Sequence, residues 1–246
     1  MKAVLLVAGR STRLYPLTLD KPKCLLEVGG KTLLEHQLDA LAAVGIDELV
    51  LVTGYLSEMI EAKIDEIRPR YPFPVKFVFS PDFAKTNNLH SLWAAKDELD
   101  GEDFLCLHAD VLFHPGILQK AAADPRDIVL VAEPAILQET MKLQLDGDRV
   151  TSVGKHISMK EADGTFPGIA KFSAAGGQKL FAEMATLLET DMNAYFTFAA
   201  ESLIKKGTEV QASFTGGLPW IEIDIEAELK EAEKRVLPLI NASPVQ

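Results

Sequence analysis

Cysteine is scarce in this sequence: its 246 residues include two, Cys24 and Cys106, both in apolar surroundings without metal-ligand spacing. Buried free thiols are the usual state of such residues, so we expect neither a disulfide nor a cysteine metal site. Long apolar runs are also missing. No stretch reaches membrane-spanning length, and the apolar N-terminal run is too short for the core of a signal peptide. These absences predict a cytoplasmic protein without a membrane segment.

Basic residues are fewer than acidic ones: the sequence has 25 Lys and Arg residues and 36 Asp and Glu residues, which gives a formal net charge of −11. Such a chain is poorly suited to broad binding of nucleic acid or of anionic membranes. Several catalytic motifs are absent as well: the Gly-x-Ser-x-Gly elbow, the complete Walker motif Gly-x-x-x-x-Gly-Lys-Ser/Thr and the His-Glu-x-x-His metal motif. Their absence disfavours serine-hydrolase chemistry, P-loop hydrolysis of ATP and zinc-peptidase chemistry.

Apolar periodicity predicts alternating strands and helices in the first half of the chain. We expect buried strands at 2–7, 48–54, 75–79, 103–108 and 128–132, and helices at 32–44, 57–67 and 90–98. Thr32 with Glu35 forms a capping box before the first helix, Gly45 ends it, and Ser57 is expected to cap the second. This order predicts an α/β fold with a doubly wound, mostly parallel sheet.

The second half changes pattern, so the sheet is expected to become mixed. Short strands at 141–145 and 149–153 flank the turn Asp146-Gly147-Asp148, and 169–172 is a candidate strand to pair with them. The remaining expected elements are helices at 178–188, 193–205 and 225–236, strands at 209–214 and 220–224, and a loose tail at 237–246. No linker or repeat interrupts the chain, which predicts a single domain over 1–246.

The segment 1–28 carries the first candidate site. Gly9 follows the first strand and would allow a sharp turn and a close backbone approach to a ligand. Arg10 and Arg13 lie on the loop, and Lys23 follows on a proline-stiffened segment. Exposed N–H groups and convergent cations at the end of a first strand suit a polyphosphate. On these residues alone, solvated surface cations remain the alternative.

Two aspartates follow apolar strands. Asp110 comes just after the strand at 103–108, and Asp224 ends the strand at 220–224. Ligands of doubly wound sheets bind at the carboxyl ends of the strands, which favours Asp110 as a ligand. Asp224 directly precedes a helix, so a ligand role and an ordinary N-cap role both stay open.

The order of apolar strand, Ala-Gly, Arg, Arg-Leu, Pro-Lys and Leu25-Leu26-x-Val28 resembles the signature of nucleotidyltransferases related to sugar-1-phosphate nucleotidylyltransferases. Ser11 stands where that family most often has glycine. The string Asn87-Asn88-x-x-Ser91-Leu92, together with 220–224, is more similar to bacterial choline-phosphate cytidylyltransferases and to relatives that activate phosphonates or inositol phosphate. The resemblance implies a Rossmann-like nucleotidyltransferase fold, with 1–112 as the nucleotide-binding half and 113–236 as the acceptor-binding half.

The resemblance also implies roles for particular residues. The expected site comprises Arg13, Lys23 and Lys155 for catalysis; Ala8, Gly9, Arg10, Lys23, Asn88 and Ser91 for the nucleotide; Lys155, Trp220 and Glu222 for the acceptor; and Asp110 and Asp224 for Mg²⁺. Trp220 with Tyr195 or Phe196 could form an aromatic wall for a quaternary ammonium, although packing at a sheet edge is an equal alternative. His90 and His108 are expected to be packing or loop residues.

The activity expected from the resemblance is Mg²⁺-dependent transfer of CMP from CTP to a small phosphorylated or phosphonate acceptor, such as choline phosphate, with release of pyrophosphate. CTP and that metabolite are the expected partners, without nucleic acid or membrane, and a homo-oligomer stays open. The first alternative is a sugar-1-phosphate nucleotidylyltransferase that uses UTP, dTTP or GTP. The second is a catalytically silent, nucleotide-sensing subunit.

Overall fold

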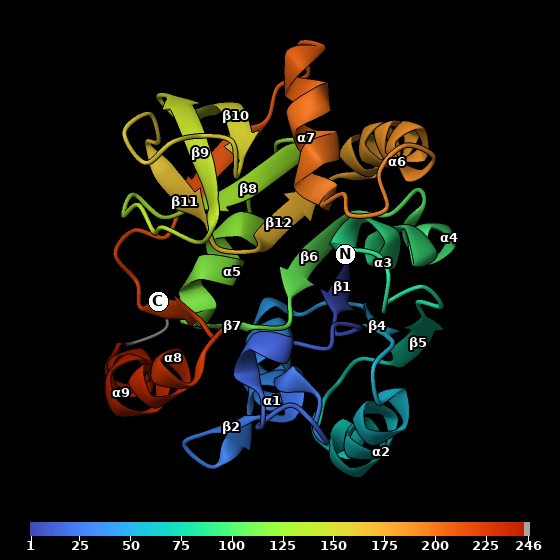
Figure 1. The fold of residues 1–246 in the computed structure, drawn as a ribbon, viewed down its shortest axis with the longest axis vertical. Coiled ribbons are helices and arrows are strands. Elements are labelled where there is room, and N and C mark those ends of the chain that lie inside the picture. The colour runs from blue at the N-terminus through green and yellow to red at the C-terminus, as the bar shows by residue number, and fades with distance from the viewer. Residues whose placement is uncertain (244–246) are drawn as a thin grey trace.

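A computed structural model describes residues 1–243 and arranges them around one large sheet with helices on both faces (Figure 1). The sheet contains β1 (Lys2–Leu6), β4 (Glu48–Thr53), β5 (Val75–Phe79), β6 (Phe104–His108), β8 (Ile128–Ala132), β9 (Met141–Asp146), β10 (Arg149–Gly154), β11 (Gly164–Phe166), β12 (Ile169–Phe172) and β13 (Gln211–Phe214). Their spatial order is β11-β9-β10-β13-β8-β12-β6-β1-β4-β5.

Strand direction changes across this sheet. β1 lies parallel to β4 and β6, and β4 lies parallel to β5, as the strand-helix-strand order predicts. β12 runs antiparallel between β6 and β8, and β9 and β10 form an antiparallel hairpin. The expected doubly wound sheet that becomes mixed is therefore confirmed.

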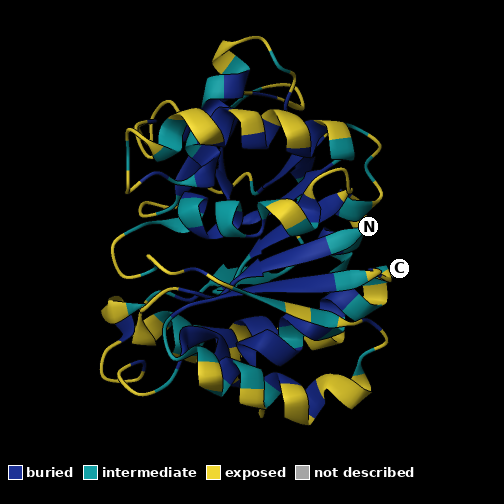
Figure 2. Ribbon diagram, turned by 90° about the vertical axis from the view of Figure 1, so that its right-hand side faces the viewer, coloured by how far each residue is buried: buried dark blue, intermediate teal, exposed yellow. Residues whose placement is uncertain are grey.

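Both faces of the sheet are buried. Val4 and Leu6 of β1 pack into the core on one face, while Ala3 and Leu5 pack into the core on the other. One face is covered by α1 (Leu33–Val44), α2 (Ser57–Ile67) and α5 (Pro115–Ala122), and the other by α3 (Asn88–Ala94), α4 (Lys96–Leu99), α6 (Ala174–Leu188) and α7 (Phe196–Lys205). Figure 2 shows the buried strands between helices whose outer faces are exposed. This double burial explains why the central strands are continuous apolar runs.

The helix boundaries confirm one predicted cap and correct another. Thr32 and Glu35 form the expected capping box at the start of α1, and Gly45 ends the helix with φ 77°. The predicted cap at Ser57 is wrong. Leu56, with φ 49°, takes the N-cap position of α2, and no side-chain cap bond forms there. The chain turns one residue earlier than Ser57, which is already helical.

Two other predictions need correction. The strand Ile169–Phe172 does not join the β9–β10 hairpin but lies between β6 and β8, and β11 pairs with β9 instead. The helix expected at 90–98 begins two residues earlier and breaks at Ala95 into α3 and α4.

The C-terminal segment is more ordered than expected. The helix predicted at 225–236 consists of α8 (Glu226–Glu231) followed by a π-helical turn, Ala232–Val236. Residues of the predicted loose tail form α9 (Leu237–Ala242), because Leu237 is buried in a small apolar core with Val236. Positions 244–246 of that tail lie outside the described residues.

Two short ribbons complete the fold. β2 (Glu27–Val28) pairs with β3 (Lys31–Thr32), and β7 (Val111–Phe113) pairs with β14 (Trp220–Glu222). In the second ribbon Glu222 is paired with Val111, and the N–H of Ile223 donates to the carbonyl of Asp110 at 2.9 Å. This ribbon brings a late segment of the chain to the end of the central strand β6.

Candidate active site

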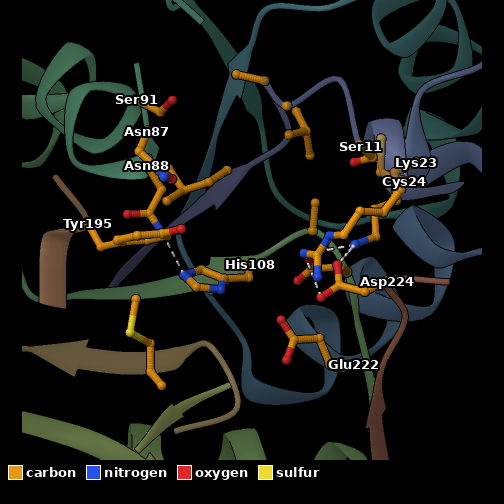
Figure 3. A pocket seen from close by; sticks show the side chains of 18 of the residues that line it. Ser11, Lys23, Cys24, Asn87, Asn88, Ser91, His108, Tyr195, Glu222 and Asp224 are labelled. Carbon is orange, nitrogen blue, oxygen red and sulfur yellow. Dashed lines mark hydrogen bonds and ion pairs between the residues drawn. The ribbon is translucent and has the colours of Figure 1, made fainter. Parts of the chain in front are cut away.

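A cavity of about 270 Å³ opens at the carboxyl ends of β1 and β6 (Figure 3). Its walls come from the loop after β1, the start of α3, the end of β6 and the ribbon segment after β14. Most of the expected site residues line it: Ala8, Gly9, Arg13, Lys23, Asn88, Ser91, Asp110, Lys155, Glu222 and Asp224. Arg10 and Trp220 do not.

The loop after β1 takes its shape from Ser11. This residue has φ 49° and ψ 49°, the left-handed conformation that glycine adopts most easily. The position where the family usually has glycine is thus the position that needs positive φ. Thr18 Oγ1 donates to the Ser11 carbonyl at 2.8 Å, which helps hold this costly conformation.

Gly9 and Arg10 differ from expectation. Gly9 is not in a positive-φ conformation, so the sharp turn expected there is instead made at Ser11. A Cβ added to Gly9 would meet no described atom within 4 Å, so nothing in the protein itself requires the glycine. The Arg10 guanidinium lies 5.8 Å from the centre of the Tyr55 ring, outside the cavity. Close approach of a ligand to Gly9 stays a prediction.

Lys23 joins the two predicted metal ligands. It lies on a buried 3₁₀ turn, Lys23–Leu25, and its Nζ is 2.9 Å from Asp110 Oδ2 and 2.8 Å from Asp224 Oδ1. The other oxygen of Asp224, Oδ2, is 2.8 Å from the Arg13 guanidinium. Because both Asp224 oxygens face cations and Ile225 takes the N-cap position of α8, the N-cap interpretation of Asp224 is wrong.

Charge pairing decides the ionisation of this cluster. Burial opposes the charged form of Lys23, but the neighbouring Asp110 and Asp224 outweigh it and raise the pKa of the lysine. Burial likewise opposes the charged form of Asp110, but Lys23 lowers the pKa of this carboxyl below its usual range. Glu222 has no such ion-pair partner within residues 1–243, so burial, followed by the charges of Asp110 and Asp224, raises its pKa to about 8.

The carboxylates are placed suitably for a divalent cation. One oxygen from each of Asp110, Glu222 and Asp224 lies within 4.8 Å of the others. Asp110 Oδ1 is buried and has no hydrogen-bond partner among the described residues. A buried acceptor without a donor is costly unless a ligand satisfies it. Hard carboxylate oxygens of this kind are the ligands that Mg²⁺ prefers, so the residues fit the ion.

A second polar group lies across the cavity on α3. Asn88 Oδ1 accepts the N–H of Phe196 at 3.0 Å, and Asn88 Nδ2 lies 3.1 Å from His108 Nε2. Burial, with the nearby charge of Lys23, lowers the pKa of His108 and favours the neutral imidazole. The Asn88 carboxamide thus ties α3 to β6 and to the start of α7, while Ser91 lines the same wall.

His108 is a site residue that the sequence interpretation missed. It was expected to be a packing or loop residue, but it lines the cavity and contacts Asn88. Its position two residues before Asp110, at the very end of a buried strand, was the available signal. Glu139 and Thr140 also line the cavity without having been predicted, because they lie in an irregular segment after β8.

Lys155 and Tyr195 form the outer wall. The Lys155 ammonium lies 5.1 Å from the centre of the Tyr195 ring and 3.4 Å from its hydroxyl. Lys155 follows the last residue of β10, and Tyr195 directly precedes α7. The cation predicted for the acceptor therefore faces the cavity, with an aromatic ring under its ammonium.

The expected aromatic wall with Trp220 is not assembled. The indole Nε1 of Trp220 donates to Glu133 Oε2 at 2.9 Å, and the ring lines an adjoining cavity of about 420 Å³ between the 137–140 segment and α8. Phe196 is fully buried in the core. Glu222 borders both cavities, so it joins the metal cluster to the space beside Trp220.

Known proteins similar to this chain include enzymes that use CTP. A CTP:phosphoglutamine cytidylyltransferase of Campylobacter jejuni is 25% identical over 94% of this chain and 98% of its own length. A CMP-5'-(3-aminopropyl)phosphonate synthase of Streptomyces rubellomurinus is 30% identical over 97% of this chain, which spans 39% of that protein. The solved inositol-1-phosphate CTP transferase from T. maritima has the same fold, with a TM-score of 0.83 and 21% identity over 98% of this chain and 94% of that one.

The doubly wound sheet, the cation-bearing loop after β1 and the acidic cluster at β6 define an enzyme of the nucleotidyltransferase class. The chain belongs to the MobA-like NTP transferase domain family, whose model matches residues 3–156. The family resemblance predicted from the sequence is thereby confirmed. No helix in the described part of the chain is long and apolar enough to cross a membrane.

Proposed function

We propose that this nucleotidyltransferase is a cytidylyltransferase, which transfers CMP from CTP to a small phosphorylated or phosphonate acceptor and releases pyrophosphate. The activities for which the Campylobacter and Streptomyces relatives are named support the choice of CTP and of such an acceptor. Residues 1–112 would bind the nucleotide and residues 113–236 the acceptor.

One observation carries the proposal: Lys23 and Arg13 lie directly against Asp224, in the same cavity as the loop after β1. A triphosphate bound by backbone N–H groups of residues 8–10 would meet these two cations. The acidic cluster beneath them suits the divalent ion that accompanies a nucleoside triphosphate. The cavity thus places cations for the triphosphate next to carboxylates for the metal ion that the triphosphate would bind.

In the proposed reaction an acceptor phosphate or phosphonate oxygen forms a bond to the α-phosphorus of CTP. The bond from that phosphorus to the bridging oxygen of the β-phosphate breaks, and its electron pair leaves with pyrophosphate. No covalent enzyme intermediate is needed, so the protein contributes alignment and charge neutralisation. Arg13 and Lys23 would neutralise the leaving pyrophosphate, while Lys155 would offset repulsion between the two anions.

Asp110 and Asp224 would hold Mg²⁺, with Glu222 as the third carboxyl of the cluster. When bound, this ion would supply positive charge to the phosphate oxygens in the transition state. Asn88 and Ser91 would lie on the nucleotide side. Glu222 and Trp220 would border the part of the acceptor that extends into the adjoining cavity.

Pyrophosphate release from the purified chain tests this function. Each of CTP, UTP, ATP, GTP and dTTP would be combined, with Mg²⁺ present, with a panel of small phosphates, phosphonates and sugar 1-phosphates. We expect turnover with CTP and a small phosphate or phosphonate. Turnover confined to UTP or dTTP with a sugar phosphate would assign the chain to sugar-nucleotide synthesis instead. Nucleotide binding without turnover in any pair would favour a silent sensing subunit.

A further inference from the structure

Helix α7 contacts the candidate acceptor wall at two separate points. Tyr195 directly precedes the helix, and Glu201 lies in its second turn and is buried against β10. Figure 1 shows α7 beside β10. The Glu201 carboxylate accepts the N–H of Val153 at 2.7 Å and the hydroxyl of Ser152 at 3.1 Å. These hydrogen bonds connect the end of β10 to α7.

Lys155 follows this fastened segment by two residues. Its ammonium reaches back over the ring of Tyr195 at the start of the same helix. Helix α7 thus contributes to the position of Lys155 in two ways. Glu201 holds the backbone segment that precedes Lys155, and Tyr195 provides the ring against which the Lys155 ammonium packs. A buried charged acceptor bonded to a backbone N–H is a strong restraint, because charged hydrogen bonds are stronger than neutral ones.

Glu201 itself has no contact with the cavity. Its charge is compensated by Lys205, with Nζ 3.1 Å from Oε1, and the His156 Nε2 lies 3.6 Å from the same oxygen. The carboxylate is therefore engaged within the protein, and its direct bonds connect α7 to Ser152 and Val153 of β10.

We propose that Glu201 is a positioning residue for Lys155. By holding Ser152 and Val153, it keeps the Lys155 ammonium at the cavity wall where the acceptor phosphate would bind. This inference rests on the proposed function, because it takes Lys155 as the group that meets the acceptor. We expect its effect to fall mainly on the acceptor, because Glu201 bonds directly to the strand from whose end Lys155 extends.

Glu183 offers a matched control. It is also a buried glutamate next to α7, with its Oε1 accepting from Ser202 at 2.5 Å and its Oε2 2.7 Å from Lys206 Nζ. It lies on α6 and bonds to Ser202 and Lys206 of the α7 segment, whereas Glu201 bonds to β10. Removal of Glu183 therefore reports the general cost of losing a buried carboxylate on this helix pair.

The kinetic test compares Glu201→Ala with Glu183→Ala. In Glu201→Ala we expect the acceptor KM to rise about tenfold, while the KM for CTP changes less than about twofold. Glu183→Ala should leave both KM values near wild type. In Glu201→Gln the amide oxygen still accepts the Val153 N–H, so this variant should recover most of the acceptor affinity.

A double-mutant cycle separates positioning from general damage. In a Lys155→Met background, Glu201→Ala should add less than about twofold to the acceptor KM, because the side chain that it positions is gone. A full additional tenfold loss in that background would overturn the proposal. So would an unchanged acceptor KM in Glu201→Ala when the wild-type enzyme turns over normally.

Hydrogen exchange supplies a readout that does not depend on turnover. Amides of residues 150–157 should exchange faster in Glu201→Ala and not in Glu183→Ala, since the Val153 N–H loses its acceptor. Unchanged exchange at residues 150–157 in Glu201→Ala would show that Glu201 does not hold this segment and would overturn the proposal. Absence of turnover in the wild-type chain with every substrate pair would instead refute the proposed function, so the two failures are distinguishable.

Discussion

Lys23 and Asp110 are in direct contact beneath the loop that follows β1, with 2.9 Å between Nζ and Oδ2. The lysine is 6% exposed, and its ammonium reaches Asp224 as well. An amine of the protein itself therefore lies between the two carboxylates that we propose as metal ligands. In the nucleotide-free protein, this ammonium and a divalent cation would compete for the same oxygens.

Replacing Lys23 with Met should therefore strengthen the binding of a divalent ion in the absence of nucleotide, by about tenfold or more, because the competing positive charge is removed. A titration with Mn²⁺ followed by electron paramagnetic resonance measures this affinity. Lys155→Met is the control, since Lys155 lines the same cavity without touching Asp110 or Asp224. Turnover of Lys23→Met should fall, because the cation proposed to neutralise pyrophosphate is lost.

Two results would contradict this expectation. An Mn²⁺ affinity in Lys23→Met that is equal to or weaker than that of the wild type would mean that the ammonium does not compete with the metal. An equal gain in Lys155→Met would mean that only the overall charge of the cavity matters. Lys23→Gln, which keeps a hydrogen-bond donor, is a second variant for the case in which Lys23→Met does not fold. Thermal unfolding measures whether each variant is folded.

Asp110→Asn should abolish turnover without unfolding the protein. We expect kcat to fall by about a hundredfold or more, because an amide oxygen is a poorer ligand for a hard cation and the negative charge is lost. The fold should persist, since Asn has nearly the same shape and Asp224 still pairs with Lys23. Asp146→Asn, in the exposed β9–β10 turn, is the control for pyrophosphate release. A near wild-type rate in Asp110→Asn would refute the metal assignment.

The fold was predictable where local signals decide the structure. The capping box of Thr32 and Glu35 and the apolar run of β1 depend on neighbouring residues, and both were correctly predicted. Partners of short strands depend on contacts between distant segments. Nothing local in Ile169–Phe172 indicates that it lies between β6 and β8, because any strand buried on both faces has the same apolar pattern.

The site was predictable where a residue follows a strand. Asp110 was found in this way, whereas Lys23 was found from its place on a proline-stiffened cationic segment; the two meet in the cavity although 87 positions separate them. His108 was missed because an imidazole at the end of a buried strand looks like packing until its contact with Asn88 is seen. Trp220 was misplaced because its indole N–H is satisfied by Glu133, a pairing that only the tertiary structure brings about.

Glu35 should make stability depend on pH. Burial alone would raise its pKa, but the Thr32 N–H and the Arg70 guanidinium outweigh burial and lower the pKa from 4.5 to about 2. The folded state therefore favours the ionised form, and this contribution is present above pH 4.5 and lost as the pH falls toward 2. Glu35→Gln should cost about 2 kcal/mol in the free energy of unfolding at pH 7, and less at pH 3.5.

Urea denaturation at both pH values measures this cost. The control is Glu66→Gln, because Glu66 pairs with Lys63 at the surface, where an ion pair contributes little. It should change the free energy of unfolding only slightly at either pH. A cost for Glu35→Gln that is as large at pH 3.5 as at pH 7 would show that shape, and not ionisation, explains the effect.

The acceptor side should favour a primary ammonium over a quaternary one. The Tyr195 ring is already covered by Lys155, and the Trp220 indole bonds to Glu133, so these two rings do not form the aromatic wall that a quaternary ammonium would need. A primary ammonium can donate hydrogen bonds to Glu139 and Glu222, whereas a trimethylammonium cannot. We expect kcat/KM for ethanolamine phosphate to exceed that for choline phosphate by about tenfold.

Pyrophosphate release at subsaturating acceptor measures this ratio with two compounds that differ only in N-methylation. Glu139→Gln should narrow the difference in kcat/KM between the two acceptors, because it removes the charge of a carboxylate that lines the cavity. Glu161→Gln is a suitable control, since that exposed carboxylate bonds to Ser158 and lies outside the cavity. A higher kcat/KM for choline phosphate than for ethanolamine phosphate would contradict this expectation and would mean that another part of the cavity binds the quaternary ammonium.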